Sequence, residues 1–64
     1  MSHRQITIAI DAMGGDGSPL KSLKGAEIFS KKYPNVNLKI FGENNLINKT
    51  INDHNIQLKN YELI

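Results

Sequence analysis

The feature that most constrains this chain of 64 residues is a repeated switch in the spacing of its apolar side chains. Some segments place apolar residues at every second position, which is typical of strands. Others place them three and four residues apart, which is typical of helices. The spacing predicts strands over 6–11, 36–41 and 56–60 and helices over 19–32 and 44–53. Strands that alternate with helices pair in parallel through right-handed crossovers. The sequence therefore predicts an α/β chain in β-α-β-α-β order.

Three parallel strands and two helices leave a sheet edge and a sheet face open. A chain this short buries only about 60% of its unfolded surface, and it has no cysteine with which to form a disulfide. We therefore interpret residues 1–64 as the amino-terminal fragment of one longer α/β catalytic domain, whose remainder is absent, and expect them not to form a stable monomer alone. The alternative is a very small complete domain.

Composition excludes several classes of protein. The net charge of +2 comes from eight basic and six acidic residues, and among the basic residues only Lys31 and Lys32 are adjacent. Such scattered lysines argue against a nucleic-acid surface. The sequence has neither a His/Cys cluster for a metal nor a signal peptide, and no apolar run long enough to span a membrane. We therefore expect a cytoplasmic protein without a metal.

The most informative segment is the glycine-rich stretch over 11–19, which reads D-A-M-G-G-D-G-S-P. It joins the carboxyl end of the first predicted strand to the first predicted helix, where ligands bind in open α/β sheets. Glycine N–H groups and a helix N-terminus favour an anion there, and a tight Gly-Gly turn at Gly15 predicts a positive φ. Ser18 is the predicted N-cap, with Pro19 at the first helical position. The alternative is a tight turn that holds no ligand.

Two well-known phosphate-binding motifs do not fit this stretch. The dinucleotide motif G-x-G-x-x-G and the Walker motif G-x-x-x-x-G-K-[ST] both require glycine at position 20, which is Leu20. Pro19 also removes a backbone N–H that could hold phosphate. A nucleotide-binding enzyme is therefore the least favoured hypothesis.

The string D-A-M-G-G-D over 11–16, followed by Pro19, resembles the opening signature of the bacterial phosphate acyltransferases of phospholipid synthesis, the PlsX family. The pair Gly25-Ala26 and the segment N-x-x-I-F-G-E over 37–43 are also similar. The resemblance covers nearly all of this chain but only about the first fifth of a family member. It implies a Rossmann-like fold of the isopropylmalate dehydrogenase-like group.

The resemblance also implies an activity. The family moves a fatty acyl group from acyl-acyl-carrier protein to inorganic phosphate, and a membrane glycerol-3-phosphate acyltransferase uses the acyl phosphate product. It implies no metal or nucleotide cofactor, a homodimer, and a cytoplasmic protein with peripheral membrane association. The competing hypothesis is a small non-enzymatic binding module or a decayed reading frame.

Within the loop, the substrate- and phosphate-binding candidates are Asp11, Met13, Gly14, Gly15, Asp16 and Gly17. Their glycine N–H groups can face phosphate or an oxyanion. The two aspartates would repel phosphate, so we expect them to orient the loop or a basic residue from outside this chain, or to cap the loop. Met13 is expected either to line an acyl channel or to pack in the core.

Other polar residues are weaker candidates. Ser18 and Ser22 lack the G-x-S-x-G context of a nucleophile, so the catalytic residues are unknown and expected beyond Ile64, and the fragment alone is expected to be inactive. Glu43 is either near the ligand or a helix-start carboxylate. Gly25 in mid-helix costs about 1 kcal/mol relative to alanine, which indicates close backbone packing there or genetic drift.

Overall fold

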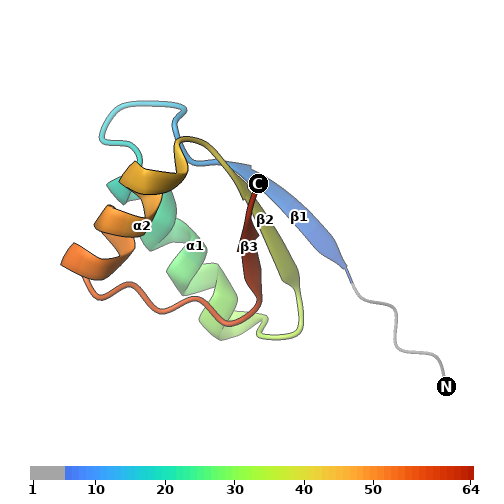
Figure 1. Ribbon diagram of the computed structural model, residues 1–64. Coiled ribbons are helices and arrows are strands. Elements are labelled where there is room, and N and C mark those ends of the chain that lie inside the picture. The colour runs from blue at the N-terminus through green and yellow to red at the C-terminus, as the bar shows by residue number, and fades with distance from the viewer. Residues whose placement is uncertain (1–5) are drawn as a thin grey trace, which may run out of the picture.

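The computed structural model describes residues 6–64 (Figure 1). Its elements in chain order are β1 (Thr7–Asp11), α1 (Leu20–Lys32), β2 (Asn37–Phe41), α2 (Asn44–Asp53) and β3 (Tyr61–Leu63). The three strands form one parallel sheet. The predicted β-α-β-α-β order is confirmed, and the arrangement is that of the opening of a Rossmann-like sheet.

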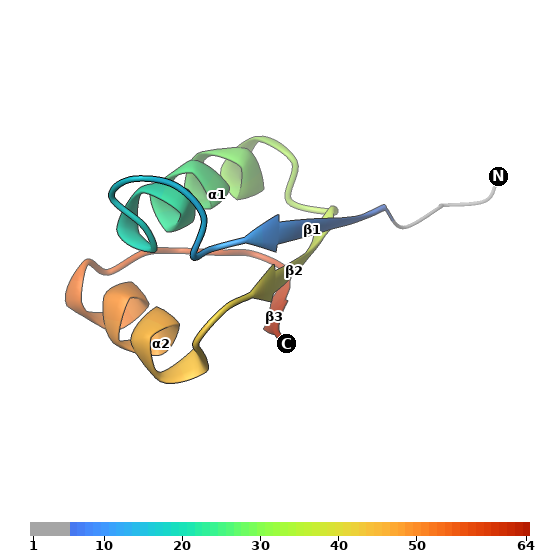
Figure 2. The same cartoon turned by 90° about the horizontal axis from the view of Figure 1, so that it is seen from above.

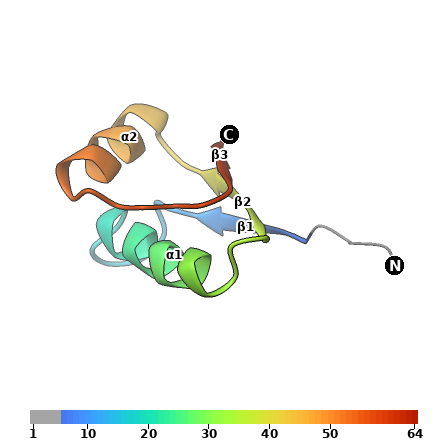
Figure 3. The ribbon, with the colours of Figure 1, turned by 90° about the horizontal axis from the view of Figure 1, so that it is seen from below.

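The sheet has the order β1-β2-β3, so β2 lies in the middle. Both crossover helices lie on the same side of the sheet (Figures 2 and 3). On β2 the alternate residues Leu38 and Ile40 are fully buried, because their side chains point toward the helices. Their register partners Ile8 and Ile10 on β1 share this face. The core therefore lies between one face of the sheet and the two helices.

The opposite face of the sheet has no helix over it within the described residues. It carries the small residues Thr7 and Ala9 on β1, and Lys39 on β2 beside its register partner Glu62 on β3. The expected open face and open edges are thus present. The small side chains lie on the face without helices.

Helix α1 buries Leu23 and Ala26 in the core, together with the polar residue Ser30. Tyr33 follows its last turn as the C-cap residue, and the Tyr33 ring lies 5.0 Å from that of Phe29 between centroids. A Cβ built on Gly25 meets nothing within 4 Å. Of the two explanations given for Gly25, close backbone packing is therefore absent among residues 6–64.

The third strand does not lie where the sequence predicts it. Residues 56–60 form a loop, and β3 begins only at Tyr61. Ile56 is buried in the core, yet the backbone N–H groups after it donate to side chains of α1: Gln57 N to Glu27 Oε2 at 2.8 Å, and Lys59 N to Ser30 Oγ at 2.7 Å. The alternation of Ile56 and Leu58 therefore reflects packing under α1 rather than sheet pairing.

Candidate anion site at the carboxyl edge of the sheet

The loop over 12–19 leaves the carboxyl end of β1 and lies beside the start of α2 (Figure 1). Its first residue is anchored, because Ala12 is fully buried and its N–H donates to the carbonyl oxygen of Phe41 at 2.9 Å. Residues 13–17 are exposed. The loop is thus fixed to the sheet at its start and open to solvent beyond that point.

Asp11 holds the first turn of the loop. Its Oδ1 accepts a hydrogen bond from the backbone N–H of Met13 at 3.0 Å, an Asx-turn contact that shapes the backbone two residues on. A Cβ on Gly14 would lie 3.3 Å from the other carboxylate oxygen. The geometry therefore gives Asp11 the loop-capping contact that the sequence left as one of two alternatives.

The tip of the loop presents unused backbone donors. Gly15 has φ +86° and Gly17 has φ +81°, so the positive φ predicted at Gly15 is confirmed. Within residues 6–64, the N–H groups of residues 14–18 have no hydrogen-bond acceptor. Successive free N–H groups in a turn of this kind form a concave site for an anion.

Ser18 does not cap α1, so that prediction is wrong. Pro19 occupies the cap position with helical backbone angles and has no side-chain acceptor to offer. The Ser18 hydroxyl instead donates to the carbonyl oxygen of Gly14 at 2.5 Å and lies 3.2 Å from Ser22 Oγ. It closes the loop on itself, and the Gly17 carbonyl accepts from Lys21 N at the start of α1.

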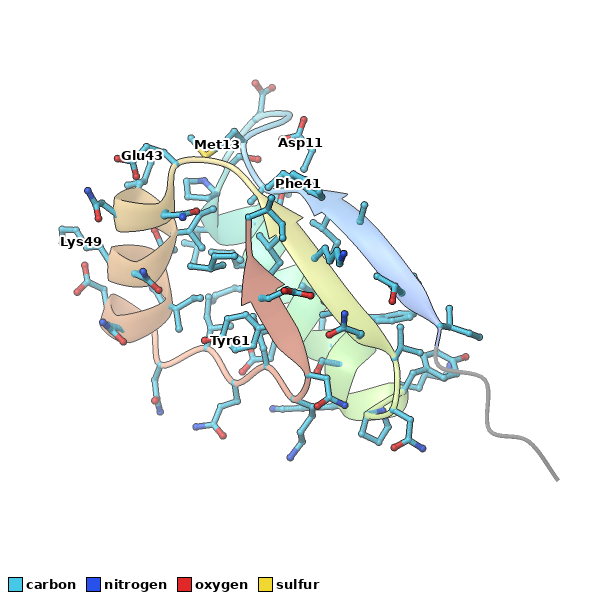
Figure 4. The ribbon with its side chains drawn as sticks, turned by 45° about the vertical axis from the view of Figure 1, so that its right-hand side comes forward. Asp11, Met13, Phe41, Glu43, Lys49 and Tyr61 are labelled. Carbon is cyan, nitrogen blue, oxygen red and sulfur yellow. The ribbon has the colours of Figure 1, made fainter. Side chains whose placement is uncertain are left out.

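Met13 connects the loop to the turn between β2 and α2. Its side chain is 41% exposed, and a Cβ on Gly42 would lie 2.8 Å from its Cγ and 2.9 Å from Ile47 Cδ1. Figure 4 shows Met13 with Asp11, Phe41 and Glu43 at the same edge of the sheet. Met13 therefore packs over Gly42 while part of its side chain stays in solvent.

Glu43 caps α2, because its Oε2 accepts from Leu46 N at 2.7 Å. This is the helix-start alternative given above, and it leaves the carboxylate engaged with backbone rather than free. In the sequence, Gly42 and Phe41 are noted only as part of the segment over 37–43; Phe41 is exposed and is the register partner of Asp11. Register between adjacent strand ends was the signal that could have found Phe41.

Two further charged residues, Asp16 and Lys21, lie in or beside the loop. Asp16 is exposed and makes no hydrogen bond or ion pair with the described residues. The stem of Lys21 passes the loop, with its Cδ 3.4 Å from where a Cβ on Gly17 would stand. Over residues 6–64 there is no group of three possible metal ligands and no helix long and apolar enough to cross a membrane. The loop therefore offers an anion backbone N–H groups, with the aliphatic stem of Lys21 beside Gly17.

Comparisons with known proteins place this loop in context. The chain is similar to proteins named phosphate acyltransferase: 41% identical over 46 residues to that of Leuconostoc mesenteroides, 45% over 47 residues to that of Oenococcus oeni, and 36% over 61 residues to that of Parvibaculum lavamentivorans. These matches cover 72%, 73% and 95% of this chain but only 14%, 14% and 17% of the relatives. No family model and no solved structure matches.

Proposed function

Because this chain corresponds in sequence to a segment of phosphate acyltransferases, we propose that it supplies the first loop of the active site of such an enzyme. The reaction proposed is transfer of a fatty acyl group from acyl-acyl-carrier protein to inorganic phosphate. The segment spans 14–17% of these relatives, and the proposal assigns the remaining parts of the site to residues outside 1–64.

The proposed chemistry needs what the loop offers. A phosphate oxygen attacks the thioester carbonyl carbon, the carbonyl oxygen becomes an oxyanion, and the C–S bond breaks. The products are an acyl phosphate and the carrier thiol. Both phosphate and the oxyanion are stabilised by preorganised N–H donors that are not already bonded. The backbone groups at Gly14, Gly15 and Gly17 are such donors.

The acidic residues have supporting roles in this proposal. Asp11 fixes the loop through Met13 N, and Asp16 stays free to orient a basic group from outside this chain. Met13, half exposed over Gly42, provides an apolar contact for an acyl or thioester chain. The proposal includes a homodimer in the cytoplasm that associates peripherally with the membrane, as the family resemblance implies.

One observation carries the proposal: the matched segment places a run of unbonded N–H groups, around two glycines with positive φ, at the carboxyl edge of a parallel sheet. The test uses the full-length natural protein that contains residues 1–64. It is incubated with acyl-acyl-carrier protein and phosphate, and hydroxylamine traps any acyl phosphate as a hydroxamate. Hydroxylamine also reacts directly with the thioester, so the rate without enzyme is subtracted. We expect an enzyme-dependent rate of hydroxamate formation that requires phosphate and is lost when sulfate replaces it.

Release of free fatty acid at a rate independent of phosphate would overturn the proposal, because it would indicate thioester hydrolysis. Absence of any acyl product from folded protein would overturn it as well.

A further inference from the structure

The outer side of α1 carries a surface that the proposed reaction does not use. Four lysines between positions 21 and 32 gather there because the helix repeats every 3.6 residues. With Gly25 and Ile28 they lie on the side of α1 opposite Leu23 and Ala26, and all six are exposed. This surface, the α1 basic stripe, comprises Lys21, Lys24, Gly25, Ile28, Lys31 and Lys32.

Among residues 6–64, Lys31 is the only lysine of the stripe with an ion-pair partner. The only acidic residue of α1 is Glu27 on its flank, which lies 3.9 Å from Lys31 and accepts a shorter hydrogen bond from Gln57 N. Lys32 lies over the Tyr33 ring at 5.7 Å. A row of exposed ammonium groups attracts an acidic surface and speeds its approach.

Two further features suit close contact with another protein. Ile28 is 71% exposed at the centre of the stripe, an aliphatic side chain ringed by lysines. Beside it, Gly25 leaves open space, with nothing within 4 Å of the point where a Cβ would stand. A mid-helix glycine is unfavourable, and no neighbour among residues 6–64 requires it. The outer surface of α1 is therefore open at Gly25.

We propose that the α1 basic stripe binds an acidic amphipathic helix of another protein, laid along α1 with its apolar side chain against Ile28 and its backbone close to Gly25. The stripe runs roughly 16 Å from Lys21 to Lys32, about three turns of a helix. A lipid surface fits less well, because a single isoleucine gives little apolar area for insertion. The proposal goes beyond the acyl transfer proposed above and does not depend on it.

The test uses the full-length natural protein and a fluorescein-labelled helical peptide of 18 residues with four glutamates around one leucine on a single face. Binding is followed by fluorescence anisotropy at two salt concentrations. We expect Lys24→Glu with Lys31→Glu to weaken binding about tenfold or more. The matched control, Lys49→Glu with Lys59→Glu, carries the same change in charge outside the stripe and is expected to stay within about threefold of the wild type.

Gly25→Gln tests whether Gly25 serves partner binding or is only the result of genetic drift. Glutamine is a better helix former, so the thermal midpoint should rise, while the side chain fills this open space and should weaken peptide binding about fivefold. A rise in midpoint with unchanged binding would overturn the role given to Gly25.

Three other outcomes would overturn the proposal. One is equal binding of a peptide with the same composition but its glutamates spread around the helix. Another is binding of phosphatidylglycerol vesicles, lost in the stripe variant, without binding of the peptide. The third is a lowered thermal midpoint in the stripe variant with no peptide binding by the wild type, which would mean that another part of the longer protein covers the stripe.

Discussion

The two strand-to-helix connections at the carboxyl edge of the sheet differ in their length and in how they use glycine. Each leads from a parallel strand into a helix and contains glycine. Each also has a carboxylate in it or next to it, Asp11 or Glu43, that accepts a backbone N–H. The β1–α1 connection runs over residues 12–19 and is mostly exposed, whereas the β2–α2 connection consists of Gly42 and Glu43.

Glycine has a different purpose in each connection. Around Gly15 there is open space, and the residue is required by its backbone angle, φ +86°. At Gly42 the constraint is space, because Met13 and Ile47 lie within 3 Å of where a Cβ would stand. The long connection therefore leaves room outside for a ligand, whereas the short one fills the room inside the fold.

The largest expected effect is on activity, at Gly15. In the full-length protein, Gly15→Val should lower the rate of the proposed acyl phosphate formation at least ~100-fold, because a β-branched residue disfavours positive φ and displaces the N–H donors. The rate is measured by hydroxamate trapping, after circular dichroism shows native folding. Lys59→Ala is the control, expected within about threefold of the wild type. Near-normal activity in folded Gly15→Val would show that the β1–α1 connection is only a turn and holds no anion.

Next in size is a loss of stability at Gly42. Gly42→Val should destabilise the protein by about 2–3 kcal/mol, since the added atoms force Met13 and Ile47 to move. Urea denaturation of the full-length protein measures the change. The smaller substitution Gly42→Ala should recover part of its lost stability when combined with Met13→Ala, which removes the nearest atoms. Equal stabilities of Gly42→Val and the wild type would remove the distinction drawn between the two glycines.

Replacing either capping carboxylate, Asp11 or Glu43, should change stability less than replacing Gly42 with valine. Glu43→Ala removes the acceptor for Leu46 N and should cost about 1 kcal/mol, whereas Glu43→Gln keeps an acceptor oxygen and should cost less. Asp11→Asn likewise keeps an acceptor for Met13 N, and Asp11→Ala does not. The urea midpoint is the measurement for all four variants. If Asp11→Asn loses activity at unchanged stability, the charge of Asp11 has a role beyond the cap.

The smallest effect is expected at the far end of α2, away from both connections. The Lys49 ammonium, hydrogen-bonded to Asp53, lowers the pKa of that carboxyl, and His54 adds a weaker contribution. A lowered folded-state pKa gives stability that is present above about pH 4 and lost as pH falls through the lowered value. Lys49→Ala should flatten this acid-range slope in thermal midpoints taken from pH 2 to 6. An unchanged slope would show that the exposed pair contributes nothing measurable.

Much of the fold follows from local patterns. The predicted helix over 44–53 matches α2 at both ends, and the apolar alternation in β1 and β2 locates both strands within one residue. Periodicity succeeds there because these elements bury one face, so the sequence repeats with the geometry. Residues 56–60 alternate in the same way, but their N–H groups donate to α1 side chains that lie far away in sequence. A local sequence pattern does not indicate hydrogen-bond partners that are so far away in the sequence.

The sequence likewise predicts part of the candidate site. The sequence alone identifies the loop and the positive φ of Gly15, because few residues tolerate that conformation. It did not assign the capping contacts of Asp11 and Glu43 or the hydroxyl of Ser18, since each depends on where a neighbouring backbone group lies. The crowding at Gly42 comes from Met13, a contact between two different connections.

The hydrogen bonds from residues 57 and 59 to α1 have a consequence for hydrogen exchange. The amide protons of Gln57 and Lys59 lie in a loop, yet their acceptors are the side chains of Glu27 and Ser30 on the helix. They exchange only when the loop separates from α1, and so report on that contact rather than on the opening of the sheet. A slow amide at Lys59, whose acceptor is buried, would mark helix and loop as one cooperative unit that joins β3 to the rest of the molecule.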